Sequence, residues 1–404
     1  MPASFATVGV QGLNLFDGVQ PEPADALLQL IGMYARDPRA HKIDVGVGVF
    51  RDDFGETPVL KSVKLAEQEL LQTEDSKSYL GAEGDLGFTH LLTPIVFGVH
   101  ATHNSQLRGI QTPGGTGALR LAFEFVAGLN PNAKIWVGSP TWANHVPIIN
   151  ASHLRPKLHA YFDGGSGVLD FDAMVSSLSD MARGDVMLLH GCCHNPTGAD
   201  FKITQWREIA KLLETRGVLP LVDLAYQGLG EGLEPDAAGM RCLLDTVPEA
   251  LIAYSCDKNF GLYRERVGGL WVKAANEHDT ELAFSKLLSL ARCLWSMPPS
   301  HGAAVVRTIL EDVDLQQLWQ HELGAKRERL SGLRAKLSAT HPRLEPLAHQ
   351  RGMFATLPLS PADVTELRQS NAIYMAESGR INIAGLRDDT IRPFAEAIIP
   401  FLTS

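Results

Sequence analysis

The chain has 404 residues, of which 45% are hydrophobic, and this length allows a large core and two or three domains. Its 46 acidic and 36 basic residues give a net charge of −10, which disfavours nucleic acid and anionic membrane surfaces as partners. No apolar run approaches the length of a membrane span. No basic residue precedes Arg36, so we expect no secretory signal or transit peptide. The five cysteines are an odd number, which does not suit a disulfide framework. We therefore expect a cytoplasmic protein.

Strand and helix patterns alternate through the middle of the chain. Helical stripes cover residues 119–126 and residues 203–213, and Gly217 closes the second stripe. Short apolar runs predict buried strands at Lys134–Gly138, Val186–His190, Val218–Asp223 and Leu251–Ser255. Pro220 conflicts with a central strand, so its strand is expected at a sheet edge or with a later start. This alternation predicts an α/β sheet with parallel pairs.

The last third of the chain has a different, mainly helical pattern. A long charged amphipathic helix is predicted over residues 314–337 and another helix over residues 391–402, whereas the part before residue 48 is short and proline-rich. We therefore predict a large α/β domain over residues 48–309. Residues 1–47 and 310–404 would together form an N-terminal arm and a smaller α+β domain.

Two loops carry candidates for ligand binding. Gly115 and Thr116 lie in a glycine-rich run just before a helical stripe, so backbone N–H groups at a helix N-terminus could face an anion; the alternative is a plain turn. The stretch from His190 to His194 contains two cysteines, but neighbours along an extended segment point to alternate sides. Few of them could share one ion, so no metal site is predicted. Asn195 could instead offer its amide at the carboxyl end of a strand.

Two ionisable side chains lie at predicted strand ends. Asp223 ends a buried strand, where a carboxylate needs a cationic partner. Taken alone, this residue is better explained as a helix-capping aspartate. Lys258 follows the strand that ends at Ser255. A lone lysine is normally a solvated surface group, but beside a buried strand end it tends to lose its proton and become a nucleophile.

Together these segments resemble the class I aspartate and aromatic aminotransferases, which have the fold type I architecture of pyridoxal-phosphate enzymes. The resemblance covers nearly the whole chain, from residues 44–50 through 78–81, 113–119 and 139–145 to 378–382. Its most specific blocks are His-Asn-Pro-Thr-Gly at 194–198 and Ser-x-x-Lys-Asn-Phe-Gly-Leu-Tyr-x-Glu-Arg at 255–266.

The resemblance implies a role for each cofactor contact. Lys258 would hold pyridoxal 5'-phosphate as a covalent imine and move the Cα proton, and Asp223 would keep the pyridine nitrogen protonated. Tyr226 and Asn195 would hydrogen-bond the ring hydroxyl oxygen, while His145 and His190 would lie behind Asp223 and orient it. The other implied cofactor residues are Gly115, Thr116, Trp142, Ser255, Arg266 and, from the neighbouring subunit, Tyr79.

The resemblance also implies a substrate site shared within a homodimer. Arg380 would bind the α-carboxylate, Gly48 would face the substrate through its backbone, and Arg292 would bind a distal carboxylate across the dimer interface. Trp142 and Asn195 would contact the substrate as well. The implied reaction moves the amino group of aspartate, phenylalanine or tyrosine to 2-oxoglutarate by a ping-pong mechanism. The alternatives are a strictly aspartate-specific enzyme, another pyridoxal-phosphate reaction, or a non-catalytic ligand sensor on the same fold.

A few positions depart from the family pattern. Asp257 stands beside Lys258 where many members have serine, which bears on the environment of the phosphate. Trp295 and Met297 replace a common tyrosine and a common asparagine or serine near Arg292, and methionine suits a pocket that changes shape. These two residues favour aromatic as well as dicarboxylic substrates, whereas Val49 and Thr116 resemble the aspartate-selective members.

Overall fold

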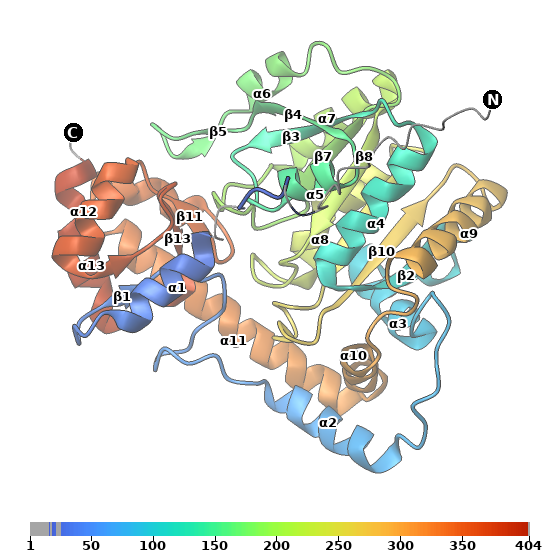
Figure 1. The fold of residues 1–404 in the computed structure, drawn as a ribbon, viewed down its shortest axis with the longest axis horizontal. Helices are drawn as coiled ribbons and strands as arrows, with labels where there is room; N and C mark the ends of the chain where they lie inside the picture. Colours follow the sequence, from blue (N-terminus) through green and yellow to red (C-terminus); the bar gives the residue numbers. More distant parts are fainter. Residues whose placement is uncertain (1–15, 17, 22–25, 403–404) are drawn as a thin grey trace, which may run out of the picture.

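A seven-stranded sheet forms the centre of the computed structural model, which describes residues 16, 18–21 and 26–402 (Figure 1). The predicted N-terminal arm thus lies partly outside the described residues. In spatial order the strands are β2 (Leu107–Pro113), β10 (Val267–Lys273), β9 (Ala250–Ser255), β8 (Leu219–Leu224), β7 (Val186–His190), β3 (Lys134–Ser139) and β4 (Arg155–Ala160). Strand β10 is antiparallel to both of its neighbours, and all other pairs are parallel.

The four predicted strands are present, and one expectation about them is wrong. Strand β7 has the predicted bounds, β3 and β9 differ from theirs by one residue at one end, and β8 differs by one residue at each end. Pro220 does not mark an edge, because β8 lies between β7 and β9. The strand does start one residue later than predicted, at Leu219. Pro220 pairs with Met187 of β7, and pairing with β9 starts only at Leu221. At Pro220, which has no N–H to donate, β8 is thus paired with a strand on one side only.

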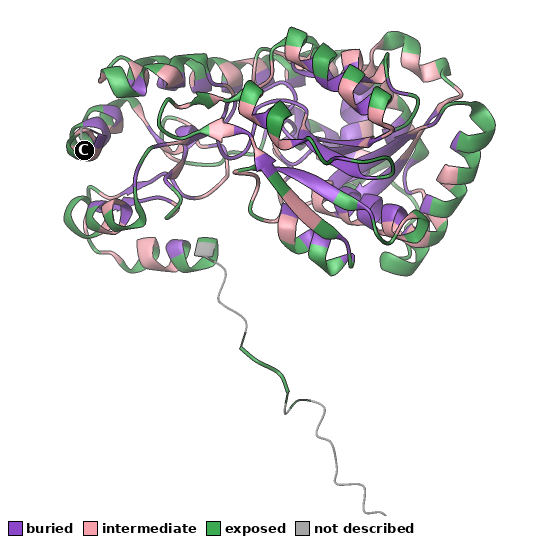
Figure 2. Cartoon of the chain, turned by 90° about the horizontal axis from the view of Figure 1, so that it is seen from above, coloured by how far each residue is buried: buried purple, intermediate pink, exposed green. Residues whose placement is uncertain are grey.

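Helices cover both faces of the sheet, as expected for an α/β architecture. One face packs against α4 (Gly114–Leu129), α5 (His145–Ala151) and α9 (Glu277–Leu294), and the other against α3 (Leu86–Phe97), α7 (Ile203–Arg216), α8 (Leu233–Leu244) and α10 (His301–Glu311). Side chains alternate between the two cores along each strand, so that Ile135 and Val137 face one and Trp136 the other. The central strands of the sheet are buried, whereas the edge strand β4 is mostly intermediate or exposed and the helices expose their outer faces (Figure 2).

Residues 26–44 and the last part of the chain lie together beside the sheet (Figure 1). Strand β1 (Ile43–Asp44) pairs with β12 (Ile373–Tyr374), and β11 (Phe354–Thr356) pairs with β13 (Arg380–Asn382). The surrounding helices are α1 (Ala26–Arg36), α12 (Pro361–Asn371) and α13 (Asp388–Leu402). The long α11 (Val313–Ser338) runs from this group to α10 and to α2 (Lys61–Thr73). The domain boundaries at residues 48 and 309 stay a prediction.

The predicted helices are present with ordinary helix-end signals. Helix α4 covers the stripe at 119–126, α7 covers 203–213, and α11 and α13 match the two C-terminal predictions within a few residues. Gly217 ends α7 in the left-handed region at φ +65°, and Asp312 caps α11 through its side chain. The remaining short elements are β5 (Phe162–Asp163), β6 (Val168–Leu169), α6 (Phe171–Ser177), and the 3₁₀ turns Val99–His103, Pro342–His349 and Ile383–Gly385. No helix in the described ranges is long and apolar enough to cross a membrane.

Candidate active site

The predicted site residues gather because several strands end at the same edge of the sheet. Strands β2, β3, β7, β8 and β9 all point toward this edge, since β10 is antiparallel to both β2 and β9. Thr116, Trp142, Asn195 and Lys258 follow the ends of four of these strands. Arg266 reaches the same edge from the other direction, because it immediately precedes the antiparallel β10. The carboxyl ends of parallel strands are where α/β proteins bind ligands.

A cavity of about 300 Å³ opens at this edge. Every site residue predicted from the sequence lines it, apart from Tyr79, Arg292 and His145, the last of which was expected behind Asp223. The lining therefore includes Gly48, Gly115, Thr116, Trp142, Asn195, Asp223, Tyr226, Ser255, Lys258, Arg266 and Arg380. Gly48 and Arg380 come from the outer ends of the chain, so the cavity lies between the large sheet and the group of elements around β13.

Lys258 presents a largely buried amine to this cavity. Its side chain is 18% exposed, and its Nζ lies 3.9 Å from Asp257 Oδ2 and 5.3 Å from the centre of the Tyr226 ring. Burial lowers the pKa of Lys258, and the charges of Asp257 and Asp223 only partly oppose this effect. A lowered pKa increases the share of the neutral amine, which is the nucleophilic form.

Asp223 supplies a buried negative charge to the same cavity. The Nε2 atom of His145 lies 3.1 Å from Asp223 Oδ2, and His145 Nδ1 lies 2.7 Å from Thr141 Oγ1. Burial alone would raise the pKa of Asp223, but the hydrogen bond with His145 and the nearby positive charges outweigh it, and the pKa is lowered. The carboxyl therefore stays an anion and is suited to hold a cation in the cavity.

The two histidines behind Asp223 differ in their contacts. His145 holds the carboxylate directly, as predicted, whereas His190 stacks obliquely on His145 with ring centres 5.1 Å apart. His190 Nε2 is buried without a hydrogen-bond partner in the structure. Burial lowers the pKa of His190 to about 3, so its ring is neutral at physiological pH. His190 thus lines the cavity beside Asp223 rather than bonding to it.

A cradle for an anion lies at the start of α4. Gly115 and Thr116 belong to the first turn of this helix, where unpaired N–H groups and the helix dipole favour negative charge. Gly114 has φ +69°, and a Cβ there would lie 2.6 Å from Arg266 Nη2, so glycine both permits the turn and leaves room for the guanidinium. Ser255 closes the cradle, since a Cβ on Gly115 would lie 3.1 Å from its Cβ.

Arg266 is already engaged by a carboxylate from its own loop. Its Nη1 donates to Asp257 Oδ2 at 2.6 Å and to the carbonyl oxygen of Tyr263 at 3.0 Å. Asp257 is 5% exposed, and its Oδ1 is buried without a hydrogen-bond partner in the structure. The unusual acid noted in the sequence therefore points at the cradle and not away from it.

Tyr226 and Asn195 form a polar pair on the wall of the cavity. The Asn195 amide donates to the Tyr226 hydroxyl at 3.3 Å, and Asn195 Oδ1 is buried without a partner in the structure. Burial and the charge of Asp223 raise the pKa of Tyr226 far above its ordinary value. The phenol therefore keeps its proton and is available as a donor toward the cavity.

Arg380 closes the cavity from the side of β13. Its Nη2 donates to the carbonyl oxygen of Gly46 at 2.7 Å, and its guanidinium lies 4.9 Å from the centre of the Phe354 ring. Its Nε is buried without a hydrogen-bond partner in the structure. Burial lowers the pKa of Arg380, but arginine remains protonated in proteins, so this side chain offers a desolvated cation with a free donor to a carboxylate.

The family model "Aminotransferase class I and II" matches residues 40–398 of the chain. The chain belongs to this family. Tyrosine aminotransferase from Rhizobium meliloti (strain 1021) is 49% identical over 377 residues, which cover 92% of this chain and 96% of the relative. Aspartate aminotransferase from Escherichia coli (strain K12) is 41% identical over 396 residues, covering 96% of this chain and all of the relative (100%).

The fold agrees with solved aminotransferase structures. One of them is the crystal structure of aromatic-amino-acid aminotransferase from Burkholderia pseudomallei, in which the enzyme is covalently bound to pyridoxal phosphate. It superposes with a TM-score of 0.94 at 31% identity, and the match covers 96% of this chain and 100% of that one. The fold class, the aminotransferase family and pyridoxal phosphate as the cofactor, which the sequence predicted, are confirmed. The residues around the cavity also fit this cofactor, because they offer an amine, a buried carboxylate and an anion cradle.

Tyr79 and Arg292 lie outside the cavity of the aminotransferase chain. Tyr79 is 92% exposed, and Arg292, in the last turn of α9, donates to Ser296 Oγ. The two loops nevertheless touch each other, because the N–H of Leu80 lies 3.0 Å from the sulfur of Met297. Both residues thus belong to one exposed region of the surface.

Some lining residues could not be recognised from the sequence. Phe354 lies under Arg380 and meets the Tyr226 ring edge-on, with centres 5.9 Å apart. It belongs to a three-residue strand with no polar motif nearby, so no local signal marks it. Leu27, Val47, Leu119 and Ala225 also line the cavity.

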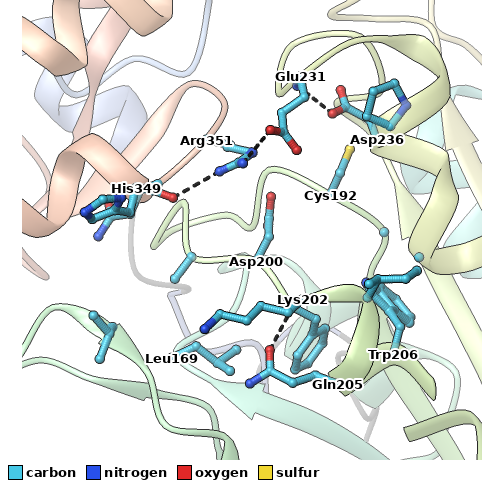
Figure 3. A pocket seen from close by; sticks show the side chains of 18 of the residues that line it. Leu169, Cys192, Asp200, Lys202, Gln205, Trp206, Glu231, Asp236, His349 and Arg351 are labelled. Carbon is cyan, nitrogen blue, oxygen red and sulfur yellow. Dashed lines mark hydrogen bonds and ion pairs between the residues drawn. The ribbon is translucent and has the colours of Figure 1, made fainter. Parts of the chain in front are cut away.

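A larger cavity of about 950 Å³ lies elsewhere and does not include Lys258 (Figure 3). Several of its charged groups are already paired: Arg351 binds Glu231 at 2.6 Å, and Asp200 accepts from the backbone N–H groups of Cys193 and His194. Asp200 thereby holds the loop that carries Asn195 into the smaller cavity. His190 lies with His145 and Asp223, whereas Cys192 and Cys193 lie together with Asp236. The expected alternation of side chains is therefore wrong for the two adjacent cysteines, because Cys193 has φ +52° and the segment is not extended there.

Proposed function

We propose that the protein transfers the amino group of aspartate and of aromatic amino acids to 2-oxoglutarate, with Lys258 as the residue that carries pyridoxal phosphate. The observation that carries this proposal is the cavity itself, where the Lys258 amine, the Asp223 carboxylate and the cradle at α4 face one another. When bound, pyridoxal phosphate supplies an electron sink for the carbanion that forms when the Cα proton leaves.

Each group around the cavity has a distinct task in this proposal. Asp223, oriented by His145, would hold the pyridine nitrogen as a cation. Gly115, Thr116 and Ser255 would hold the phosphate with Arg266, and Trp142 would lie against the ring. The Tyr226 hydroxyl and the Asn195 amide, 3.3 Å apart, would bind the ring hydroxyl oxygen.

Lys258 would also move the substrate proton. Burial lowers the pKa of its amine, which favours the neutral form, and in that form Nζ can accept the Cα proton and return it to the neighbouring carbon. Arg380 would orient the substrate by binding its α-carboxylate with Nε, the donor that is unpaired in the structure. Gly48, which has no side chain, would let its own backbone approach the substrate.

A homodimer would complete the site. Tyr79 and Arg292 lie outside the cavity of their own chain but on one exposed region, which supports a role in the partner's site: Tyr79 on the phosphate and Arg292 on a distal carboxylate. The aromatic specificity is supported by relatives named as tyrosine or aromatic-amino-acid aminotransferases, and the aspartate specificity by those named as aspartate aminotransferases. A cytoplasmic location remains part of the proposal.

Chemical labelling tests the assignment of Lys258. The purified protein should be yellow, and borohydride should fix the cofactor to Lys258, as found by peptide mapping. Label on another lysine would reject the assignment. Specificity constants for aspartate, phenylalanine and tyrosine with 2-oxoglutarate test the reaction; aromatic values about 10,000-fold below aspartate, a loss of roughly 5.5 kcal/mol, would leave a strictly aspartate-specific enzyme. A bound cofactor without any turnover would instead favour a ligand sensor.

Mixed dimers test the sharing of sites. Lys258→Ala and Arg292→Asp should each inactivate the homodimer toward aspartate. A heterodimer of the two should regain one intact site, because the wild-type Lys258 and the wild-type Arg292 meet across the interface. Lys258→Ala with Arg380→Ala is the control that should not regain activity, since both residues line the same cavity. A verified heterodimer without aspartate activity would argue against sharing.

A further inference from the structure

Asp257 is a buried acid at the edge of the cradle that none of the proposed catalytic tasks uses. Its Oδ2 accepts from Arg266 Nη1 at 2.6 Å, and its own N–H lies 3.2 Å from Ser255 Oγ. Two of the groups proposed to hold the phosphate therefore contact Asp257. Its other carboxylate oxygen is buried without a hydrogen-bond partner in the structure.

We propose that Asp257 competes with the cofactor phosphate for Arg266, so that this chain releases its cofactor more readily than it would with serine at position 257. The inference rests on the proposed function, because the competing ligand is the phosphate of pyridoxal phosphate. It assigns to Asp257 the control of cofactor retention through Arg266.

Two effects act in the same direction. Arginine binds phosphate best through two parallel N–H···O bonds, and Asp257 already occupies one nitrogen of the Arg266 fork. A phosphate monoester carries about −1.5 to −2 charges near pH 7, so a carboxylate on the same guanidinium also repels it. Lys258 offsets little of this charge, since its Nζ lies 3.9 Å from the same oxygen and burial lowers its pKa.

Asp257 could also have the opposite effect on phosphate binding. Asp257 could hold Arg266 in the orientation that the phosphate needs, in which case removing it would weaken phosphate binding. Arg266 has φ +53° and a second bond to the carbonyl oxygen of Tyr263 at 3.0 Å, so its position does not depend on Asp257 alone. This second anchor favours competition over orientation.

The test measures binding of pyridoxamine 5'-phosphate, which cannot form a covalent bond to Lys258, to wild-type protein and to Asp257→Ser and Asp257→Asn. Asparagine keeps the shape of the side chain and removes its charge. We expect both variants to bind the probe at least about 10-fold more tightly than the wild type does. This factor is the lower end of the range for hydrogen bonds to charged groups. Pyridoxamine, which lacks the phosphate, should bind all three proteins within about threefold, which is less than 1 kcal/mol.

Asp180→Ser is a matched control, since it also removes an acid from an ion pair, here with Lys157 on the surface. It should bind pyridoxamine 5'-phosphate like the wild type. Equal or weaker binding of that probe by the two Asp257 variants would overturn the inference, and so would an equal gain for pyridoxamine. Failure of the proposed function looks different, because the wild-type protein would then bind neither probe and would not be labelled at Lys258 by borohydride.

Discussion

Lys326 should destabilise the folded protein at neutral pH, and replacing it with methionine should stabilise it. The residue lies on α11 and is 6% exposed, with its Nζ 5.2 Å from the centre of the Phe50 ring. Burial lowers the pKa of Lys326 to about 8, and the charge of Glu322 only partly opposes this effect. Methionine fills a similar volume without a charge and adapts to irregular surroundings.

The expected gain follows from the difference between the folded and unfolded pKa values. An unfolded lysine titrates near 10.4, so a folded value of about 8 corresponds to roughly 3 kcal/mol. Below pH 8 both states hold the proton and the full penalty applies. Between pH 8 and about 10.4 the folded state has lost the proton that the unfolded state keeps, so the wild type gains stability as the pH rises. Lys326→Met should be more stable by about 1–3 kcal/mol at pH 7 and by almost nothing near pH 10.4.

Chemical denaturation of the cofactor-loaded proteins at pH 7 and pH 10 measures this difference. One protein concentration is used throughout, because the stability of the proposed dimer would depend on it. Lys336→Met is the control on the same helix, since Lys336 is 55% exposed and pairs with Asp388 on the surface. It should change the free energy of unfolding by less than about 0.5 kcal/mol. A variant Lys326→Met that is less stable than the wild type at pH 7, or a gain equal at both pH values, would refute the reasoning.

Three further substitutions test the site. Asp223→Ala should fold, bind the cofactor weakly and lower turnover by orders of magnitude in steady-state assays with aspartate; wild-type-like turnover would reject its role. Arg292→Leu should lower kcat/KM for aspartate about 10- to 150-fold, as expected for hydrogen bonds to a charged group, and leave phenylalanine nearly unchanged; equal losses would show a structural role. Gly114→Ala places a Cβ 2.6 Å from Arg266 Nη2 at φ +69°, so it should weaken binding of inorganic phosphate and lower the melting temperature.

Strands with a continuous apolar run could be predicted, and those without one could not. Strand β7 matches its prediction residue for residue. Strand β10 contains Gly268 and Gly269, which break the apolar pattern, yet the structure requires glycine at 268 because a Cβ there would lie 2.5 Å from the carbonyl oxygen of Tyr254. The antiparallel β10 therefore could not be predicted from the sequence, although this strand brings Arg266 to the site.

The site could be predicted where it depends on strand ends and specific motifs. Lys258, Asp223 and Asn195 follow or end buried strands, and the carboxyl ends of such strands meet at one edge. The contact of Asp257 with Arg266 could not be predicted, because it depends on the path of the loop between them and on the positive φ of Arg266. Phe354 is likewise brought under Arg380 only by the pairing of β11 with β13.

The cations around the cavity give a reason why substrate choice would depend on two chains in the proposed homodimer. Among the described lining residues, the permanently charged or amine-bearing side chains are Lys258, Arg266 and Arg380. The proposed function assigns Lys258 to the covalent bond with the cofactor, Arg266 to the cofactor phosphate and Arg380 to the α-carboxylate of the substrate. None of the three therefore remains for the distal carboxylate of aspartate. That carboxylate would be costly to bury without a cation, and Arg292 lies outside the cavity of its own chain. In the proposed homodimer, one chain would thus hold the groups for the chemistry, while discrimination between aspartate and aromatic substrates would require the partner's surface.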